Sequence, residues 1–174
     1  MAGVGAEQAA FRAFFERHHP ELARLAYLLT GESDLADDLA ADAFVEIWRH
    51  WGRVQAAESP VAYARGVVAN VCRSRMRSMG RERSGLRAWS ALWRDRAVHD
   101  DTDVGAVVDV RGALARLPYR RRACVVLRYA FDLSERETAQ ALGISVGTVK
   151  SQTSRGAAQL AELLRAPVLA GEEW

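Results

Sequence analysis

The sequence predicts an all-α protein made of two small helical domains that are joined by a flexible linker. Apolar residues recur at helical spacing through most of the 174 residues, and glycine, proline or capping residues separate these stretches. The helical pattern breaks down between Gly80 and Gly105. With 49% hydrophobic residues, the chain has enough apolar material for packed cores. We therefore expect domains at residues 7–79 and 106–168, with a linker at residues 80–105.

Two short helices are expected first. Phe11, Phe14 and Phe15 share an apolar face, and that helix is predicted to end near His18–Pro20 because proline disrupts a helix interior. Residues 22–29 supply a second apolar face, which is stopped at Thr30–Gly31, where glycine suits a left-handed cap.

Two longer helices follow in the same domain. One begins near Ser33 and keeps helical spacing as far as Trp51. Residues 52–59 are predicted to form a polar loop. Pro60 suits the first turn of the next helix, which continues into a run of arginines.

The linker is predicted from its arginines, its acidic run and its glycines. Trp89, Leu92 and Trp93 are too apolar for a purely solvated tether. We expect them to form a short helix that docks on a domain or on a partner.

Pro118 interrupts the helical pattern of the second domain, and a helix-turn-helix is predicted after it. Ser134 and Glu137 have the spacing of a capping box, in which each side chain satisfies a backbone N–H group of the other residue. Gly143 suits the left-handed end of that helix, and Ser145 can cap the next one. Ala139, Leu142, Val146 and Val149 are expected to face the core.

Polar residues are expected on the outer face of the second helix of this motif. In DNA-binding proteins of this type, the second helix enters the major groove and its side chains reach bases and phosphates. The alternative is an ordinary helical hairpin with a polar surface. The candidates for contact with duplex DNA are Thr148, Lys150, Ser151, Ser154 and Arg155.

Charge and composition exclude several classes of protein. Residues 1–64 carry ten acids and five bases, whereas residues 65–99 carry nine arginines against two acids, which indicates one basic and one polyanionic partner. Cys72 and Cys124 have no metal-ligand spacing and read as buried free thiols. No nucleophile–base pair, metal cluster or phosphate loop is present, so we expect neither an enzyme nor a bound cofactor or metal. The lack of a membrane span or signal peptide predicts a cytoplasmic protein.

Two motifs resemble the extracytoplasmic-function (ECF) sigma factors of bacterial RNA polymerase, particularly those of actinobacteria. The first is "HPELARLAYLLTGESDLADDLAADAFVEIW", followed by "PVAYARGVVANVCRSRMR". It resembles the domain that binds polymerase and melts the −10 promoter element. The second, "LPYRRRACVVLRYAFDLSERETAQALGISVGTVKS", resembles the domain that reads the −35 element. The implied function is promoter-specific initiation of transcription, and the implied partners are core polymerase and promoter DNA, with an anti-sigma factor left open.

The resemblance implies that the third helix docks on the coiled coil of the largest polymerase subunit. Asp38, Asp42 and Glu46 recur every four residues and form an acidic stripe, which a basic partner helix would complement. Ala41 stands where the family often has glutamine, so one polar contact is missing. A merely solvated acidic face is the alternative.

The fourth helix is implied to contact the −10 strand. Tyr63 replaces the tryptophan common in the family and offers a ring on which an unpaired base can stack, although core packing is an equal alternative for this residue. Asn70 matches a characteristic asparagine that can bind a base edge. Arg73, Arg75 and Arg77 would neutralise phosphates.

The last helix departs from the family pattern. Gln152 replaces an arginine, Thr153 replaces an apolar core residue, and Gly156–Ala157 replaces Ala–Arg. A glycine inside a helix costs about 1 kcal/mol relative to alanine. Individual base contacts are therefore left open. The rival function is a stand-alone regulator that dimerises and binds DNA without polymerase.

Overall fold

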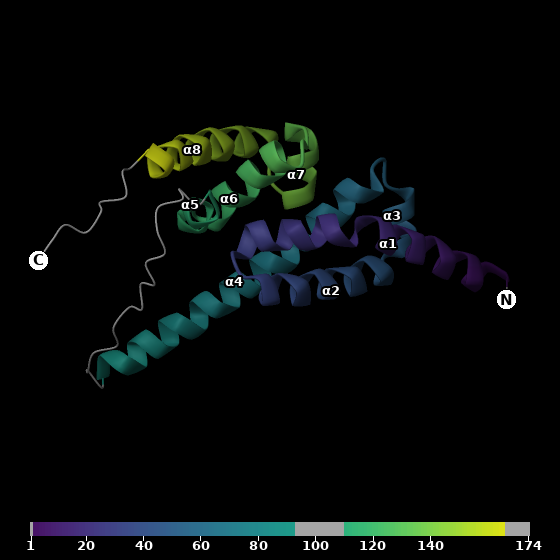
Figure 1. The fold of residues 1–174 in the computed structure, drawn as a ribbon, viewed down its shortest axis with the longest axis horizontal. Coiled ribbons are helices and arrows are strands. Elements are labelled where there is room, and N and C mark those ends of the chain that lie inside the picture. The colour runs from purple at the N-terminus through teal and green to yellow at the C-terminus, as the bar shows by residue number, and fades with distance from the viewer. Residues whose placement is uncertain (1, 93–109, 166–174) are drawn as a thin grey trace, which may run out of the picture.

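The computed structural model describes the backbone of residues 2–92 and 110–165 and the side chains of residues 5–81 and 110–165, and this part of the chain is entirely helical (Figure 1). The helices are α1 (Ala2–Thr30), α2 (Ser33–Arg49), α3 (Trp51–Ala56), α4 (Pro60–Leu92), α5 (Val110–Arg116), α6 (Tyr119–Val125), the π-helical turn η1 (Val126–Ala130), α7 (Glu135–Leu142) and α8 (Val146–Arg165). The first four form the N-terminal unit, and the remainder form the C-terminal unit. The prediction of an all-α chain with two helical units is confirmed.

Two predicted boundaries in the N-terminal unit are wrong. Pro20 does not end a helix but lies inside α1, which runs on to Thr30. Proline there removes one backbone hydrogen bond, but Leu22 and Leu25 just after it are fully buried, and tertiary packing of that face overrides the local preference. The predicted loop at residues 52–59 is mostly α3, because Trp51 and Val54 anchor that turn in the core.

Helix α4 is longer than the sequence indicated. It begins at Pro60, as predicted, but continues to Leu92, so residues 80–92 of the predicted linker are helical. The rest of the linker, with Trp93, lies outside the described residues, as do the side chains of Trp89 and Leu92. The predicted docking of these apolar residues stays a prediction.

The predicted caps are confirmed. Ser134 Oγ accepts a hydrogen bond from the N–H of Glu137 at 3.2 Å, and a Glu137 carboxylate oxygen accepts one from the N–H of Ser134 at 2.7 Å. Gly143 and Gly31 end their helices with φ values of 62° and 86°. Ser145 Oγ accepts a hydrogen bond from the N–H of Thr148 at 3.1 Å at the start of α8.

One residue of the predicted helix-turn-helix core is misplaced. Ala139, Leu142 and Val149 are buried, but Val146 is 40% exposed. Val146 is the first residue of α8. Val149, one turn later, fills the core position instead.

Gly156 lets α8 lie close to α6. A Cβ atom at this position would stand 2.7 Å from Cγ2 of Val125 and 3.3 Å from both Cβ and the carbonyl oxygen of Arg121. Gly156 is accordingly buried. The departure from the family pattern here thus has a packing reason, and it offsets the low helix propensity of glycine.

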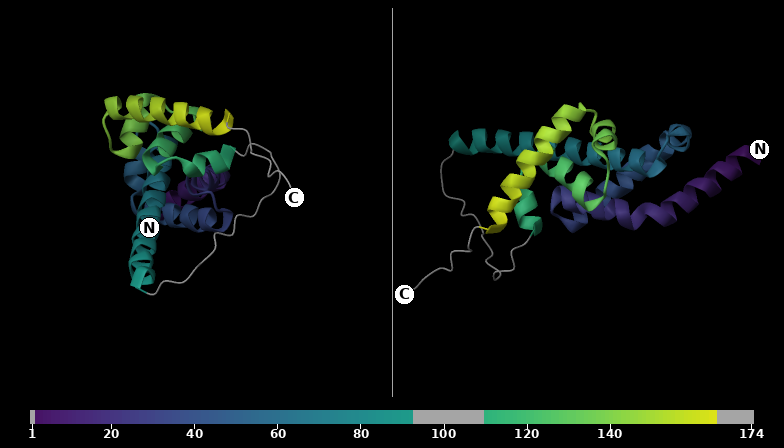
Figure 2. Two further views of the ribbon diagram at one scale, coloured as in Figure 1. Left: turned by 90° about the vertical axis from the view of Figure 1, so that its left-hand side faces the viewer. Right: turned by 90° about the horizontal axis from the view of Figure 1, so that it is seen from above.

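The two units pack against each other and share one continuous core of buried residues. Figure 2 shows the C-terminal unit seated on one side of α1 and α4, and residues of α4 and α7, of α1 and α5, and of α1 and α6 are in contact. From the sequence we expected two units joined by a flexible linker, and no feature of the sequence predicted this contact.

Candidate nucleic-acid and protein interfaces

Helix α2 exposes an acidic face. Its opposite face is buried against α1 and α4. Asp38 and Asp42 are exposed, as is Ala41 between them, and in the described part of the chain neither carboxylate has an ionic partner. Glu46 is less exposed and is already engaged, because Arg49 Nη1 lies 2.5 Å from one of its oxygens and His50 Nε2 lies 3.9 Å from the other. The predicted stripe exists, with its first two carboxylates free for a partner.

Apolar side chains extend this acidic face, and the sequence analysis missed them. Val45 is 49% exposed and Trp48 is 39% exposed, three and six residues after Asp42 on α2. Phe11 of α1 supports Trp48, with ring centroids 4.9 Å apart. Helical spacing alone placed Trp48 in the core. For Val45 the spacing was the available signal. Val45 follows Asp38 by seven residues, about two helical turns, so both lie on one face of α2.

Two of the five residues predicted to contact the −10 strand, Tyr63 and Asn70, line a cavity between the two units. Tyr63 and Asn70 share one face of α4 with Gly66 and Val67, and the cavity that they line has a volume of about 640 Å³. Tyr63 is 36% exposed, so it is not a core residue. The opposite wall comes from α7 and the residue before it: Ser134, Arg136, Glu137, Gln140 and Ala141.

The three arginines predicted to bind phosphate lie further along α4. Arg75 and Arg77 are exposed and Arg73 is half-buried. Within the described ranges none of the three forms an ion pair with a carboxylate. Arg73 and Arg77 continue the face of Asn70, three and seven residues on, whereas Arg75 points to another side. Two of the three therefore line up with the cavity.

Helix α8 presents most of its predicted polar face to solvent. Lys150, Ser151, Ser154 and Arg155 are exposed, and Thr148 is half-buried. The Thr148 hydroxyl lies 2.8 Å from Ser145 Oγ, so it belongs to the cap. Lys150 Nζ lies 3.6 Å from a carboxylate oxygen of Glu135 on α7, which offsets part of its positive charge. In the described part of the chain Arg155 is without an ion pair, which makes it the stronger anion-binding group.

Three further features concern metal binding, membrane spans and the two cysteines. Among the described residues no three His, Cys, Asp or Glu side chains are grouped as a metal would require, and no described helix has the length and apolar character to cross a bilayer. Cys72 and Cys124 are buried free thiols, as predicted. Burial raises the pKa of Cys72 to about 12 and that of Cys124 to about 11, so both stay protonated at neutral pH.

Comparison with known proteins covers both units. The family model "Sigma-70 region 2" matches residues 14–82, and "Sigma-70, region 4" matches residues 108–160. The ECF RNA polymerase sigma factor SigM of Mycobacterium tuberculosis is 35% identical over 164 residues, which are 94% of this chain and 81% of SigM. The RNA polymerase sigma-E factor of Streptomyces coelicolor is 31% identical over 158 residues, which are 91% of this chain and 88% of that protein.

A solved structure has the same overall shape. It is the sigma factor RpoE in complex with the anti-sigma factor NepR from Bartonella quintana, with a TM-score of 0.71 and 26% identity. The similarity covers 91% of this chain and 98% of that chain, and so includes both units.

Proposed function

The chain belongs to the ECF sigma factors, non-catalytic subunits that direct RNA polymerase to specific promoters, and we propose that it divides this task among three separate surfaces. These are the acidic face of α2 for core polymerase, the cavity face of α4 for the −10 strand, and the outer face of α8 for the −35 duplex. The rival function, a stand-alone regulator, does not account for the match to sigma-70 region 2 over residues 14–82.

The α2 surface supports docking through both charge and shape. Asp38 and Asp42 are exposed carboxylates that form no ion pair within the described part of the chain, so a basic helix gains an ion pair there without breaking one. Val45 and Trp48 add an apolar area directly beside them. In protein interfaces, charged residues at the rim commonly increase the rate of association. Aromatic residues buried at the centre commonly contribute much of the affinity. This pairing is the observation that carries the proposal.

The α4 surface supports recognition of an opened strand. Tyr63 offers a partly exposed ring and Asn70 an exposed amide on one face, and Arg73 and Arg77 continue that face with positive charge. Stacking of a base on an aromatic side chain is worth about 1–3 kcal/mol, comparable to the cost of unstacking it. Arg75 contributes to the general field around the strand from a different side.

The α8 surface supports contact with duplex DNA. Ser151 and Ser154 are short enough for close approach, and Arg155 is free to reach a phosphate or a guanine. Lys150 acts in the same region with its charge shared with Glu135, and Thr148 acts mainly by ordering the N-terminal turn of α8.

We also retain the finer assignments made from the sequence. The domain boundaries are placed at residues 7–79 and 106–168, and the protein acts in the cytoplasm, where polymerase and promoters are. An anti-sigma factor is a natural further partner, because the structurally similar RpoE was solved with one.

The experiment that tests the proposal reverses the free carboxylates of α2. Asp38→Lys and Asp42→Lys together should weaken binding to core polymerase at least about 100-fold, because placing like charges together across an interface costs several kcal/mol. Fluorescence titration of labelled protein with core enzyme measures the affinity. Far-UV circular dichroism checks that the helices are intact.

The matched control is Glu162→Lys, which reverses one exposed carboxylate of α8 far from this face. It should bind core polymerase as the wild type does, and each single reversal on α2 should fall between the control and the double variant. Wild-type affinity in the double variant would remove the acidic face from the polymerase interface.

A further inference from the structure

Val146 is an exposed apolar residue on α8, the helix that we assign to the −35 duplex. It is the first residue of that helix, and its side chain is 40% exposed, whereas Val149 one turn later is fully buried. An isolated apolar side chain on a surface is ordinary, but the first residues of the second helix in a helix-turn-helix lie against base edges. The side chain of Val146 therefore bears on which base pair α8 can read.

The polar groups beside Val146 serve the cap of α8. Ser145 Oγ accepts a hydrogen bond from the N–H of Thr148 at 3.1 Å, and the hydroxyl oxygens of these two residues lie 2.8 Å apart. Gly147 carries no side chain, and a Cβ atom there would have only Ser145 Oγ, at 3.9 Å, within 4 Å. The missing side chain leaves room for a base edge to approach this turn closely. Among the side chains of this first turn, Val146 therefore offers the exposed apolar surface.

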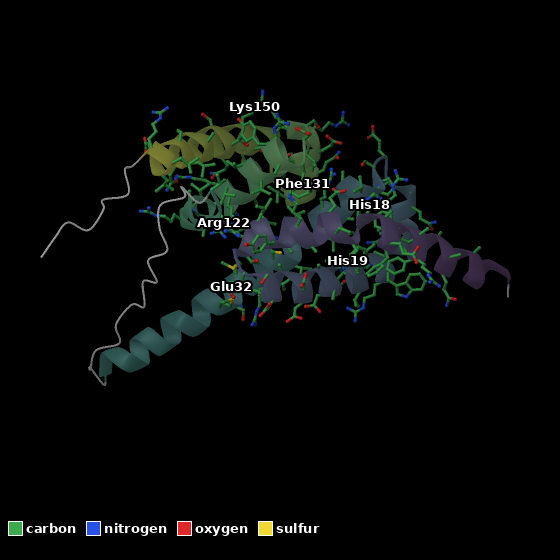
Figure 3. All side chains as sticks on the ribbon, in the orientation of Figure 1. His18, His19, Glu32, Arg122, Phe131 and Lys150 are labelled. Carbon is green, nitrogen blue, oxygen red and sulfur yellow. The ribbon has the colours of Figure 1, made fainter. Side chains whose placement is uncertain are left out.

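Lys150 lies on the same side of α8, just over one turn beyond Val146. Figure 3 shows it on the outer side of the helix, and its Nζ lies 3.6 Å from a carboxylate oxygen of Glu135 on α7. This ion pair offsets part of its charge, which weakens the attraction of Lys150 for the acceptor groups of a base pair. This side of α8 therefore begins with an apolar group and continues with a partly neutralised cation.

Thymine is the base that an exposed aliphatic side chain can recognise in the major groove. Each base pair presents a different pattern of donors and acceptors there, but only thymine adds a methyl group. The valine side chain has methyl groups and no polar atom. Contact with another base would remove its donors or acceptors from water without replacing the lost hydrogen bonds. The same contact with a thymine methyl group buries apolar surface on both sides.

We propose that Val146 is a specificity-determining residue that selects an A·T pair in the −35 element by contact with the thymine 5-methyl group. This inference rests on the proposed role of α8 as the −35 helix, and it adds the base that the first turn prefers. Arg155 and the serines further along α8 hold the duplex, whereas Val146 discriminates among base pairs at one position. Burial of one methyl group corresponds to about a fourfold change in affinity.

The test removes a methyl group from the DNA and, separately, the valine methyl groups from the protein. The chain is assembled with core polymerase, and promoter duplexes randomised over the −35 element are selected for binding to this complex. In the tightest binder, deoxyuridine then replaces thymine at one position at a time. Deoxyuridine pairs with adenine as thymine does and lacks only the 5-methyl group, so each replacement isolates one methyl contact. Fluorescence anisotropy of the labelled duplex gives the affinity.

For the wild type, one deoxyuridine replacement in the −35 element should weaken binding about fourfold. Val146→Ala should weaken binding to the thymine duplex by about the same factor, and it should lose no further affinity when that thymine is replaced. The matched control is Val110→Ala. Val110 is also an exposed valine at the first position of a helix in the C-terminal unit, but Figure 1 shows α5 at the other end of this unit from α7. This control should keep the wild-type affinity and the wild-type response to deoxyuridine.

The outcomes separate this inference from the proposed function. If selection returns no preferred −35 sequence, the assignment of α8 to that element is wrong, and the reading by Val146 falls with it. If a sequence is preferred but contains no thymine whose methyl group matters, α8 keeps its role and the inference is overturned. Equal sensitivity to deoxyuridine in Val146→Ala and the wild type overturns it as well, because the methyl contact then belongs to another residue.

Discussion

The glycine in the middle of α8 gives a stability prediction whose sign depends on two opposed terms. Gly156→Ala raises the helix propensity of α8, which favours folding by about 1 kcal/mol. The new Cβ atom would also stand 2.7 Å from Val125 Cγ2 and 3.3 Å from Arg121. Overpacking of this kind costs about 1–3 kcal/mol. Val125 is β-branched and lies in a helix, where one rotamer is strongly preferred, so a change of rotamer to relieve the contact is itself unfavourable.

The sum is a net destabilisation of about 1 kcal/mol for Gly156→Ala. For a chain of this size it corresponds to a fall in Tm of about 2–4 °C. Val125→Ala removes the clashing methyl group. In that background Gly156→Ala should lose most of its penalty, because only the 3.3 Å contacts with Arg121 remain, and it should be neutral or stabilise the protein by up to about 1 kcal/mol. The two substitutions should therefore be coupled by about 1–3 kcal/mol.

Urea unfolding followed by far-UV ellipticity measures all four members of this cycle. Gly147→Ala is the control, because it lies in the same helix and a Cβ there meets nothing closer than 3.9 Å. It should be neutral or stabilising. The reasoning is refuted if Gly156→Ala stabilises the otherwise unchanged protein, or if its cost is the same with alanine at residue 125.

Two further predictions concern the C-terminal unit. Arg155→Ala should weaken binding to a −35 duplex by about 1–3 kcal/mol and relax preference at one position if Arg155 reads a base, or weaken all sequences evenly with a smaller salt slope if it binds phosphate; titrations at several salt concentrations distinguish these, and no change in any of them excludes Arg155 from the interface. Ser134→Ala should cost about 1 kcal/mol at neutral pH through loss of the cap. Hydrogen bonds from Ser134 lower the pKa of Glu137, so this stabilisation is present above the ordinary carboxyl pKa and fades as the pH falls through the lowered value. Urea unfolding should show the gap between the two proteins narrowing in acid without closing, because the hydrogen bond from the Glu137 N–H to Ser134 Oγ does not depend on the charge of Glu137; a gap that stays constant would contradict the role of the charged Glu137.

Local signals predicted the parts of the fold that are decided within a few residues. The capping box of Ser134 and Glu137, the left-handed Gly143 and the start of α4 at Pro60 all follow from the chemistry of one turn of helix. The helix-turn-helix was recognisable for the same reason. In the second helix of this motif, the positions of the buried residues determine which residues face solvent. Four of the five candidate DNA contacts could therefore be placed on the surface from the sequence.

Contacts between distant segments decided what the sequence did not reveal. Pro20 stays helical because residues after it are buried by α2 and α4, and Gly66 and Gly156 are glycines because another helix lies on them. Arg122 was one of three consecutive arginines, with no feature to distinguish it from its neighbours. Only the packed structure shows that it is the buried one and that its partners include Leu29 in the other unit.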